Sequence, residues 1–284
     1  MSLVRAMQTP VITIEAICDV GRMRAVEELQ KEVWGIPDLE VVPATHLVAA
    51  TEAGGVLIGA FDADELVGFV YGFAGLEHGQ LAHHSHMLAV KTAYRNLDLG
   101  RRLKLAQRER VLGQGIRLMT WTFDPLQSLN AHFNFSKLGV VADRYLPNFY
   151  GEDAASFLHQ TGTDRLWVSW LLASERVEKT ITGAGDQAQR GRGLALVTVE
   201  SDGAPRRNDL SECFAGDDVS IEIPGDINSL QQQRPQTALK WREETRWAFA
   251  EAIAAGYVVV GFVREKRDDQ LIGKYWLSKA NSEL

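Results

Sequence analysis

The pattern of apolar and polar residues predicts strands in four segments of the first 90 residues, with clear alternation in the first of them. The segments are residues 11–17, 56–61, 66–73 and 81–90. An acidic turn joins the second and third segments, which makes them an antiparallel hairpin. Helical spacing at residues 21–34 predicts a helix, and Pro43 suits the first turn of a second short helix.

Helices and strands continue to alternate in the middle of the chain. The elements predicted there are a helix at 99–114, a strand at 116–123, a helix to residue 138, and strands at 140–145 and 166–172. Asp124 and Pro125 open the second of these helices, and Gly139 ends it where a left-handed cap would sit. The order predicts a mixed α/β fold with helices packed on a central sheet.

The C-terminal third combines further strands with one long helix. The strands are predicted at residues 194–199, 219–223, 257–263 and 271–277, and the helix at 235–255. Ala238, Trp241, Thr245, Ala248, Phe249 and Ala252 share one face of that helix, so this face must be buried. Either a second small α+β unit or a late extension of the first sheet would bury it.

A small, polar, glycine-rich run at residues 183–193 predicts a linker or mobile loop. The expected division is therefore a first domain at 1–172, a linker at 173–193 and a C-terminal α+β extension at 194–284. The glycines of the run do not form a phosphate loop, because no Gly-Lys-Ser/Thr follows them.

Composition predicts a soluble globular protein. The 284 residues are 45% hydrophobic and 24% charged, and no segment approaches the roughly 18 consecutive apolar residues of a membrane span. The N-terminal residues lack the features of a secretory signal, so a cytoplasmic location without membrane association is expected. Cys18 and Cys213 lie far apart, outside any paired motif, and are expected to be buried thiols.

Charge is distributed unevenly. The net charge of −7 disfavours nucleic acid as a partner, yet residues 91–117 carry eight Lys or Arg against two acids, a local balance of 8 − 2 = +6. The strand ending at Val90, the turn that follows and the start of the basic helix would place backbone N–H groups and positive charge at one point, which suits a pyrophosphate. The alternative is a solvated helix face.

The turn Arg95-Asn96-Leu97-Asp98-Leu99-Gly100 resembles the CoA-binding signature Q/R-x-x-G-x-G/A of the GNAT acyltransferase superfamily, with Asp98 in place of the first glycine. The strings SHMLAV, LKLAQRE, TWTFDPL, NAHFNFSKLG, YLPNFYG and TDRL resemble an uncharacterised subgroup of predicted acetyltransferases in that superfamily, over residues 11–172. The resemblance implies a GNAT fold and acetyl-CoA as co-substrate, with no metal. The CoA-binding positions it implies are Leu88, Ala89, Val90, Arg95, Asn96, Leu97, Asp98, Leu99, Gly100, Arg101, Asn130 and Phe133.

Transfer in this superfamily needs a base, and its usual glutamate position falls on His84 in this chain. Residues two apart on a strand share a face, so His84 and His86 should project together, with His83 and Ser85 on the other side. A histidine can act as a base at its ordinary pKa near 6.5. His84 is therefore the expected base and His86 the second choice, although structural hydrogen bonding or a metal site would also explain the histidines.

The superfamily's usual acid, a tyrosine, falls on Phe135, which leaves Tyr150 or Tyr145 as the expected proton donor. Asp124 is expected to cap a helix or to contact substrate, and Asp164 and Arg165 to pair with each other.

The resulting expectation is an acyltransferase that transfers groups other than aminoacyl groups. More specifically, we expect an N-acetyltransferase that acts on a small-molecule or peptide amine. Two other classes stay open: a CoA-binding sensor without catalysis, and a structural module whose aromatic C-terminal helix packs on a partner or in a homodimer. The sequence identifies neither the acceptor nor the acyl length.

Overall fold

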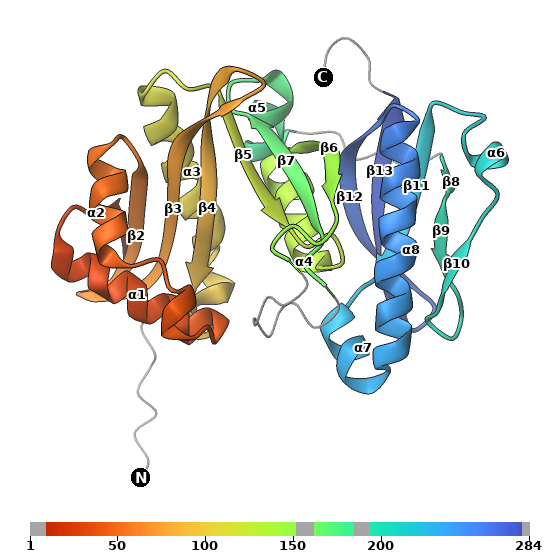
Figure 1. Ribbon diagram of the computed structural model, residues 1–284, viewed down its shortest axis with the longest axis horizontal. Helices are drawn as coiled ribbons and strands as arrows, with labels where there is room; N and C mark the ends of the chain where they lie inside the picture. The colour runs from red at the N-terminus through yellow and green to blue at the C-terminus, as the bar shows by residue number, and fades with distance from the viewer. Residues whose placement is uncertain (1–9, 152–161, 185–192, 280–284) are drawn as a thin grey trace. The chain divides into compact units, whose positions relative to one another are not determined.

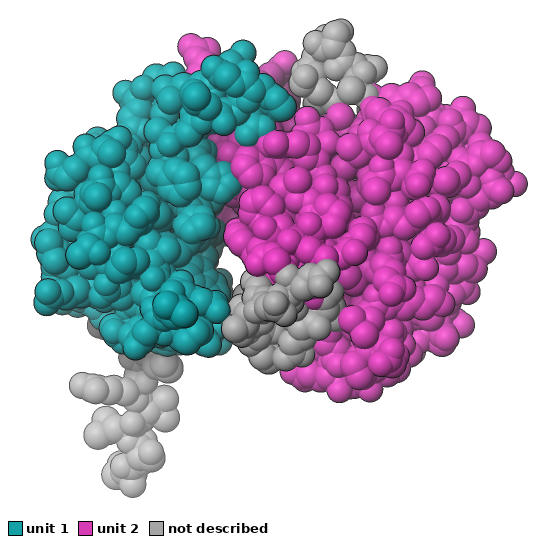
Figure 2. Space-filling view, viewed as in Figure 1, with its two compact units in different colours: residues 1–116 teal, residues 117–284 magenta. Residues whose placement is uncertain are grey.

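A computed structural model describes residues 10–151, 162–184 and 193–279 (Figure 1). The chain divides into two compact units, residues 1–116 and 117–284, which Figure 2 colours separately. Residues 185–192 of the predicted linker lie outside the described ranges. The domain boundaries expected at residues 172 and 193 remain predictions.

The first unit contains an antiparallel sheet with helices on both faces. Its described strands lie in chain order: β1 (Ile12–Ala16), β2 (Val56–Asp62), β3 (Glu65–Glu77) and β4 (Gln80–Val90). The helices are α1 (Val20–Trp34), α2 (Ala44–Glu52) and α3 (Leu99–Gly113), with the 3-10 helices η1 (Asp38–Glu40) and η2 (Thr92–Leu97). Helices α1 and α2 share a core with one face of the sheet, and α3 packs on the other face.

Local sequence explains the ends of these elements. Asp19 caps α1 by accepting a hydrogen bond from the Arg22 backbone N–H at 2.8 Å, and Gly35 ends the helix in the left-handed conformation at φ 63°. Pro43 precedes α2, as the sequence predicts. The strands and helices predicted for the first 114 residues are therefore confirmed, with ends shifted by a few residues.

One irregularity in the β3–β4 pair changes which side chains face which way. Tyr71 lies opposite Met87 and Gly72 opposite Ser85, so His86 is an extra residue in β4 and forms a β-bulge. An extra residue reverses the alternation of side chains beyond it, in the same way as a one-residue slip in register.

The second unit contains a larger, mixed sheet. Its strands are β5 (Leu118–Phe123), β6 (Val141–Leu146), β7 (Arg165–Leu171), β8 (Leu194–Ala195), β11 (Asp218–Pro224), β12 (Tyr257–Arg267) and β13 (Gln270–Lys279), in the order β5-β7-β6-β12-β13-β11-β8. The β8–β11 pair is parallel, whereas the pairs β5–β7, β6–β7, β6–β12, β12–β13 and β11–β13 are antiparallel. A separate ribbon pairs β9 (Val197–Val199) with β10 (Pro205–Arg207). The C-terminal strands therefore extend the sheet that contains β5, β6 and β7, which answers the question left open by the sequence.

The helices of the second unit include three that the sequence misses. In chain order the helices are α4 (Ser128–Ala131), the π-helix η3 (His132–Leu138), α5 (Glu175–Ile181), α6 (Leu210–Cys213), α7 (Ile227–Gln233) and α8 (Pro235–Ala254). Helices α5, α6 and α7 were not predicted, and α5 lies in the segment expected to be linker. The predicted apolar face of α8 is confirmed, because all six of its residues are buried.

Two further expectations from the sequence are wrong. The helix expected to begin at Asp124 begins at Ser128, and it continues as a π-helix rather than an α-helix. Gly139 nevertheless ends it in the left-handed conformation at φ 77°, as predicted. Of the two cysteines, Cys213 is buried but Cys18 is exposed. Among the described residues, no helix is long and apolar enough to span a membrane.

Candidate active site

The predicted site residues divide between the two units. His84, His86 and the turn that contains Arg95 lie in the first unit, whereas Asn130 and Tyr150 lie in the second.

His84 and His86 share a face of β4, as predicted, and both contact Phe73 of β3. The Phe73 ring centroid lies 5.6 Å from that of His84 and 5.8 Å from that of His86, and the two imidazoles are 6.3 Å apart. The bulge at His86 places this pair on the face of Met87, which belongs to the core shared with α1 and α2.

The opposite face of β4 carries a buried polar network beneath α3. Lys104 Nζ donates to Ser85 Oγ at 2.9 Å, and Ser85 Oγ donates to Gln107 Oε1 at 2.8 Å. Gln107 Nε2 lies 3.2 Å from His83 Nε2. His83 and Gln107 are fully buried and Lys104 is 2% exposed. His83 therefore has a structural environment, separate from the His84–His86 pair.

Burial changes the acid–base properties of all three histidines. It lowers the pKa of His84 from 6.5 to about 4, with further lowering by His86 and Lys104. Burial and the neighbouring His46 also lower the pKa of His86. The expectation that His84 would work at its ordinary pKa is therefore wrong, since desolvation disfavours the imidazolium. At neutral pH the His84 ring is uncharged and able to accept a proton.

Two further side chains beside this pair were missed by sequence reasoning. Tyr71, on β3, packs edge-on against His86 with ring centroids 6.3 Å apart, and its hydroxyl lies 2.9 Å from His46 Nε2 on α2. Burial raises the pKa of Tyr71, so its hydroxyl stays protonated at neutral pH. The alternation of Phe69, Tyr71 and Phe73 along β3 is the sequence signal that places Tyr71 on this face.

The turn after β4 keeps a left-handed backbone at the position where the superfamily signature has glycine. Asp98 has φ 55° and ψ 23°, and it directly precedes α3. Aspartate tolerates this conformation better than most residues, although glycine adopts it without steric cost. The Asp98 side chain makes no capping hydrogen bond, and its nearest basic partner is Arg101 at 3.6 Å. A capping role for Asp98 is therefore excluded.

The other predicted CoA-binding positions of the first unit surround this turn. Leu88, Ala89 and Val90 end β4, with Ala89 buried in the core and the other two half-buried. Arg95, on η2, is exposed and its Nε lies 3.5 Å from the Val90 oxygen. The first turn of α3 begins at Leu99, where backbone N–H groups lack partners within the helix.

Residues 91–117 present less positive charge at the surface than their sequence suggests. Lys104 is buried, and desolvation lowers its pKa well below the usual value. Lys91 is paired with Glu65 at 2.6 Å, and Arg102 donates to a main-chain oxygen of β1 at 2.8 Å. Of the remaining basic residues, Arg95 and Arg101 lie beside the turn, whereas Arg110 and Arg117 are exposed at and beyond the other end of α3.

In the second unit, Asn130 is exposed on α4 and Phe133 is half-buried on the π-helix. Phe135, at the position of the usual acid, is fully buried against Phe123 and Tyr275, with ring centroids 6.3 and 5.8 Å away. An apolar side chain in this setting supplies no proton, and no other group replaces it at that position of the π-helix.

Tyr150 and Tyr145 differ sharply as candidate proton donors. Tyr150 is 46% exposed, and the Arg165 guanidinium lies 5.0 Å from its ring centroid. The Tyr145 hydroxyl donates to Asp164 at 2.6 Å, and burial together with that carboxylate raises its pKa well above 10. Tyr145 is thus committed to a structural bond, while Tyr150 remains the better candidate.

Helix α8 holds the ends of β5 and β7 through two buried carboxylates. Arg242 forms two hydrogen bonds with Asp124, of 2.8 and 2.7 Å, and both side chains are nearly inaccessible to solvent. Arg246 forms a similar pair with Asp164, at 2.9 and 2.7 Å. The expected roles of these two aspartates are corrected accordingly. Asp124 does not cap α4, and the Asp164 carboxylate pairs with Arg246 rather than with its neighbour in the sequence.

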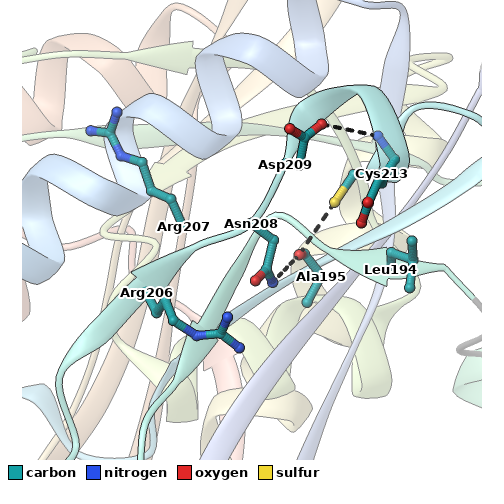
Figure 3. A pocket seen from close by; sticks show the side chains of 8 residues that line it. Leu194, Ala195, Arg206, Arg207, Asn208, Asp209 and Cys213 are labelled. Atoms are coloured by element: carbon teal, nitrogen blue, oxygen red, sulfur yellow. Dashed lines mark hydrogen bonds between the residues drawn. The ribbon is translucent and has the colours of Figure 1, made fainter.

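An open pocket of about 410 Å³ lies beside β8, β10 and α6 (Figure 3). Cys213 Sγ and Asn208 Nδ2 both point at the Ala195 oxygen, at 3.4 and 2.6 Å. Burial raises the pKa of Cys213, so the thiol is protonated and unreactive at neutral pH. Arg207, at the rim, is already paired with Glu244. These contacts are structural, and they point to no chemistry in this pocket.

Across residues 10–151, 162–184 and 193–279, no three His, Cys, Asp or Glu side chains are arranged to hold a metal ion. The metal-site interpretation of the histidines thus finds no ligand set in the part of the chain that is described.

Comparisons with known proteins find structural likeness only. No family model and no curated protein sequence matches the chain. It is similar to a structure assigned to the GNAT acetyltransferase family in Desulfovibrio desulfuricans (17% identity, 57% of this chain, 100% of that chain, TM-score 0.47). It is also similar to the ribosomal-protein-S18-alanine N-acetyltransferase of Escherichia coli (13%, 58%, 97%, 0.46) and the aminoglycoside 6'-N-acetyltransferase of Enterococcus faecium (19%, 58%, 98%, 0.43). Because these identities and TM-scores are low, the argument for function rests on the residues of this chain.

Proposed function

We propose that the protein is an acyl-CoA-dependent N-acyltransferase that moves an acetyl group from acetyl-CoA to an amine. The observation that carries the proposal is the continuity of β4, its turn and α3. One strand bears the neutral His84–His86 pair and leads through the left-handed turn at Asp98 into the N-terminus of α3. A base and an anion-binding turn are thus held by consecutive elements.

The turn would hold the pyrophosphate of CoA. Backbone N–H groups at the start of α3 and the positive end of the helix favour an anion, and Arg95 and Arg101 add charge beside it. The Asp98 carboxylate opposes an anion, but its interaction with Arg101 offsets part of this repulsion. The left-handed backbone matters more here, because it keeps the path of a glycine-containing turn.

His84 would act as the base. The amine nitrogen forms a bond with the thioester carbonyl carbon, His84 takes a proton from that nitrogen, and the carbon–sulfur bond breaks to release CoA as its thiolate. A proton donor then converts the thiolate to the thiol. The assignment of this role to Tyr150 stays a prediction from the sequence; its side chain is partly exposed, and Phe135 has no hydroxyl.

Turnover with acetyl-CoA and a mixed pool of amines, followed by mass spectrometry, tests the proposal. His84→Ala should lower turnover by about two to four orders of magnitude, the usual range for a general base, and leave CoA affinity nearly unchanged. His86→Ala is the matched control for loss of an imidazole from the same face. If His86→Ala alone abolishes turnover, His86 is the base; if both variants keep full activity, neither histidine is.

A second candidate is a CoA-binding sensor without catalysis, and the burial of Phe135 favours it. A sensor would bind CoA with the same dependence on Arg95 and would acetylate no amine. Calorimetry with CoA combined with the turnover assay separates the two functions.

A further inference from the structure

The extra residue in β4 decides on which face of the sheet the proposed base lies. The pairing of β4 with β3 shifts by one residue at His86, because Gly72 pairs with Ser85 instead of with His86. Without this shift, every side chain of β4 from His86 back to the hairpin turn would change faces, and His84 would face α3. The observed register therefore needs interactions that the shifted register lacks.

The side chains of β4 that face α3 belong to a chain of hydrogen bonds. Lys104 Nζ donates to Ser85 Oγ at 2.9 Å and to Gln107 Oε1 at 3.2 Å, and Ser85 Oγ donates to the same Oε1 at 2.8 Å. Because a lysine only donates, the Gln107 atom beside it is the oxygen, and Gln107 Nε2 donates to His83 Nε2, 3.2 Å away. Gln107 thus joins α3 to both Ser85 and His83.

Water cannot replace these bonds, because the whole chain of side chains is buried. His83 and Gln107 are fully buried, and Lys104 and Ser85 are 2% and 6% exposed. In the shifted register Ser85 and His83 would leave this face, and Lys104 and Gln107 would lose both partners. A buried polar group without a partner is destabilising, so the hydrogen bonds favour the observed register.

Packing around Gly72 favours the same register. A Cβ atom on Gly72 would lie 2.3 Å from His83 Nε2 and 3.0 Å from Gln107 Nε2, so the space above this glycine is filled. In the shifted register the residue opposite Gly72 would be His86, whose imidazole is much larger than the Ser85 hydroxyl. Overfilling a closely packed interior is destabilising.

We propose that Lys104, Gln107 and Ser85 lock the register of β4 and are positioning residues for the proposed base. In the locked register, His84 and His86 project from the face of the sheet opposite α3. This inference rests on the proposed acyltransferase function, in which His84 is the base. The three residues act through the backbone of β4, and α3, which carries two of them, also begins at the turn proposed to hold CoA.

NMR of the full-length protein tests the register directly. In wild type, an NOE should join the His84 imidazole to the Phe73 ring, because their centroids lie 5.6 Å apart. Gln107→Leu removes the bonds of Gln107 at similar volume and should add a second set of His84 signals that lacks this NOE. Gln107→Glu restores the oxygen acceptor and should keep one set. Val111→Ala, which creates a cavity elsewhere on α3, is the matched control and should also keep one set.

Release of CoA from acetyl-CoA, with the mixed pool of amines as acceptors, measures the effect on turnover. Molecules in the shifted register bind acetyl-CoA at the turn but present no base, so kcat should fall with their population while the KM for acetyl-CoA stays unchanged. In Gln107→Leu we expect a fall of about tenfold, which corresponds to about nine molecules in ten in the shifted register. Gln107→Glu should recover kcat. A merely structural role would affect Gln107→Leu and Val111→Ala alike.

The outcomes separate this inference from the function on which it rests. A single set of His84 signals with the wild-type NOE in folded Gln107→Leu overturns the register inference, whatever the turnover. If Gln107→Leu does not fold, Ser85→Ala, which removes only a hydroxyl, is measured in the same two ways and decides the question. If wild type acetylates no amine although it binds CoA, the acyltransferase function fails, and the NOE alone decides whether the network locks the register.

Discussion

The fully buried His83 should make the protein lose stability in mild acid. Burial lowers the pKa of His83 from 6.5 to about 4, and Lys104 and His84 lower it further. Between these two pKa values the unfolded chain binds a proton that the folded chain does not. Because the folded-state pKa is the lower one, protonation of His83 does not reduce the free energy of unfolding above pH 6.5. The free energy of unfolding then decreases as the pH falls from 6.5 towards 4.

The size of the effect follows from the two pKa values. A difference of 6.5 − 4, or about 2.5 units, corresponds to about 3.4 kcal/mol when it is lost completely. At pH 5 the unfolded state is almost fully protonated at this position and the folded state hardly at all. The free energy of unfolding should therefore fall by about 2 kcal/mol between pH 7 and pH 5 because of His83 alone.

Urea unfolding of wild type and His83→Gln at pH 7 and pH 5 measures this contribution. The variant should lose about 2 kcal/mol less than wild type over that interval. His78→Gln removes an exposed imidazole from a turn and should keep the wild-type dependence. An equal loss in wild type and His83→Gln would refute the reasoning, since it would mean that His83 is protonated in the folded protein.

Three further outcomes are expected. Asp98→Gly should tighten CoA binding in calorimetry, because glycine keeps the left-handed turn and removes a negative charge; weaker binding would show that the carboxylate is required. Arg95→Ala and Arg101→Ala should each weaken CoA binding, and unchanged affinity in both would leave the pyrophosphate without a site. Arg242→Met should lower the free energy of unfolding in urea by about 3 to 5 kcal/mol, because it leaves the Asp124 carboxylate buried and unpaired. A loss of less than about 1 kcal/mol would contradict this.

Periodicity predicts most elements of this fold, because strands and amphipathic helices each space their apolar residues in a characteristic way along the chain. The sequence prediction began the helix after β5 too early, and the reason involves a residue far away in the sequence. Asp124 and Pro125 look like a helix start, and the Asp124 carboxylate accepts a hydrogen bond from the Leu126 N–H, but it also binds Arg242, 118 residues away, and the helix begins only at Ser128. Such a partner leaves no mark in the sequence near Asp124.

For the candidate site, the sequence predicts the shared face of His84 and His86 but not what surrounds it. The bulge at His86 decides which side of the sheet receives the pair, and no residue type in β4 marks it. The pKa values depend on burial by α2 and α3, which strand alternation cannot reveal. Lys104 was counted as surface charge for the same reason, because its helix has basic residues on several faces.

The contacts that α8 and β12 make with earlier strands imply an order in which the two units fold during synthesis. The first unit has its own core by residue 116, so it can fold while the ribosome is still making the rest. The second unit must wait, because β6 pairs with β12 at Val259 and the Asp124 carboxylate pairs with Arg242. Until those residues emerge, the edge of β6 that pairs with β12 has no partner strand, and an open strand edge can pair with another chain.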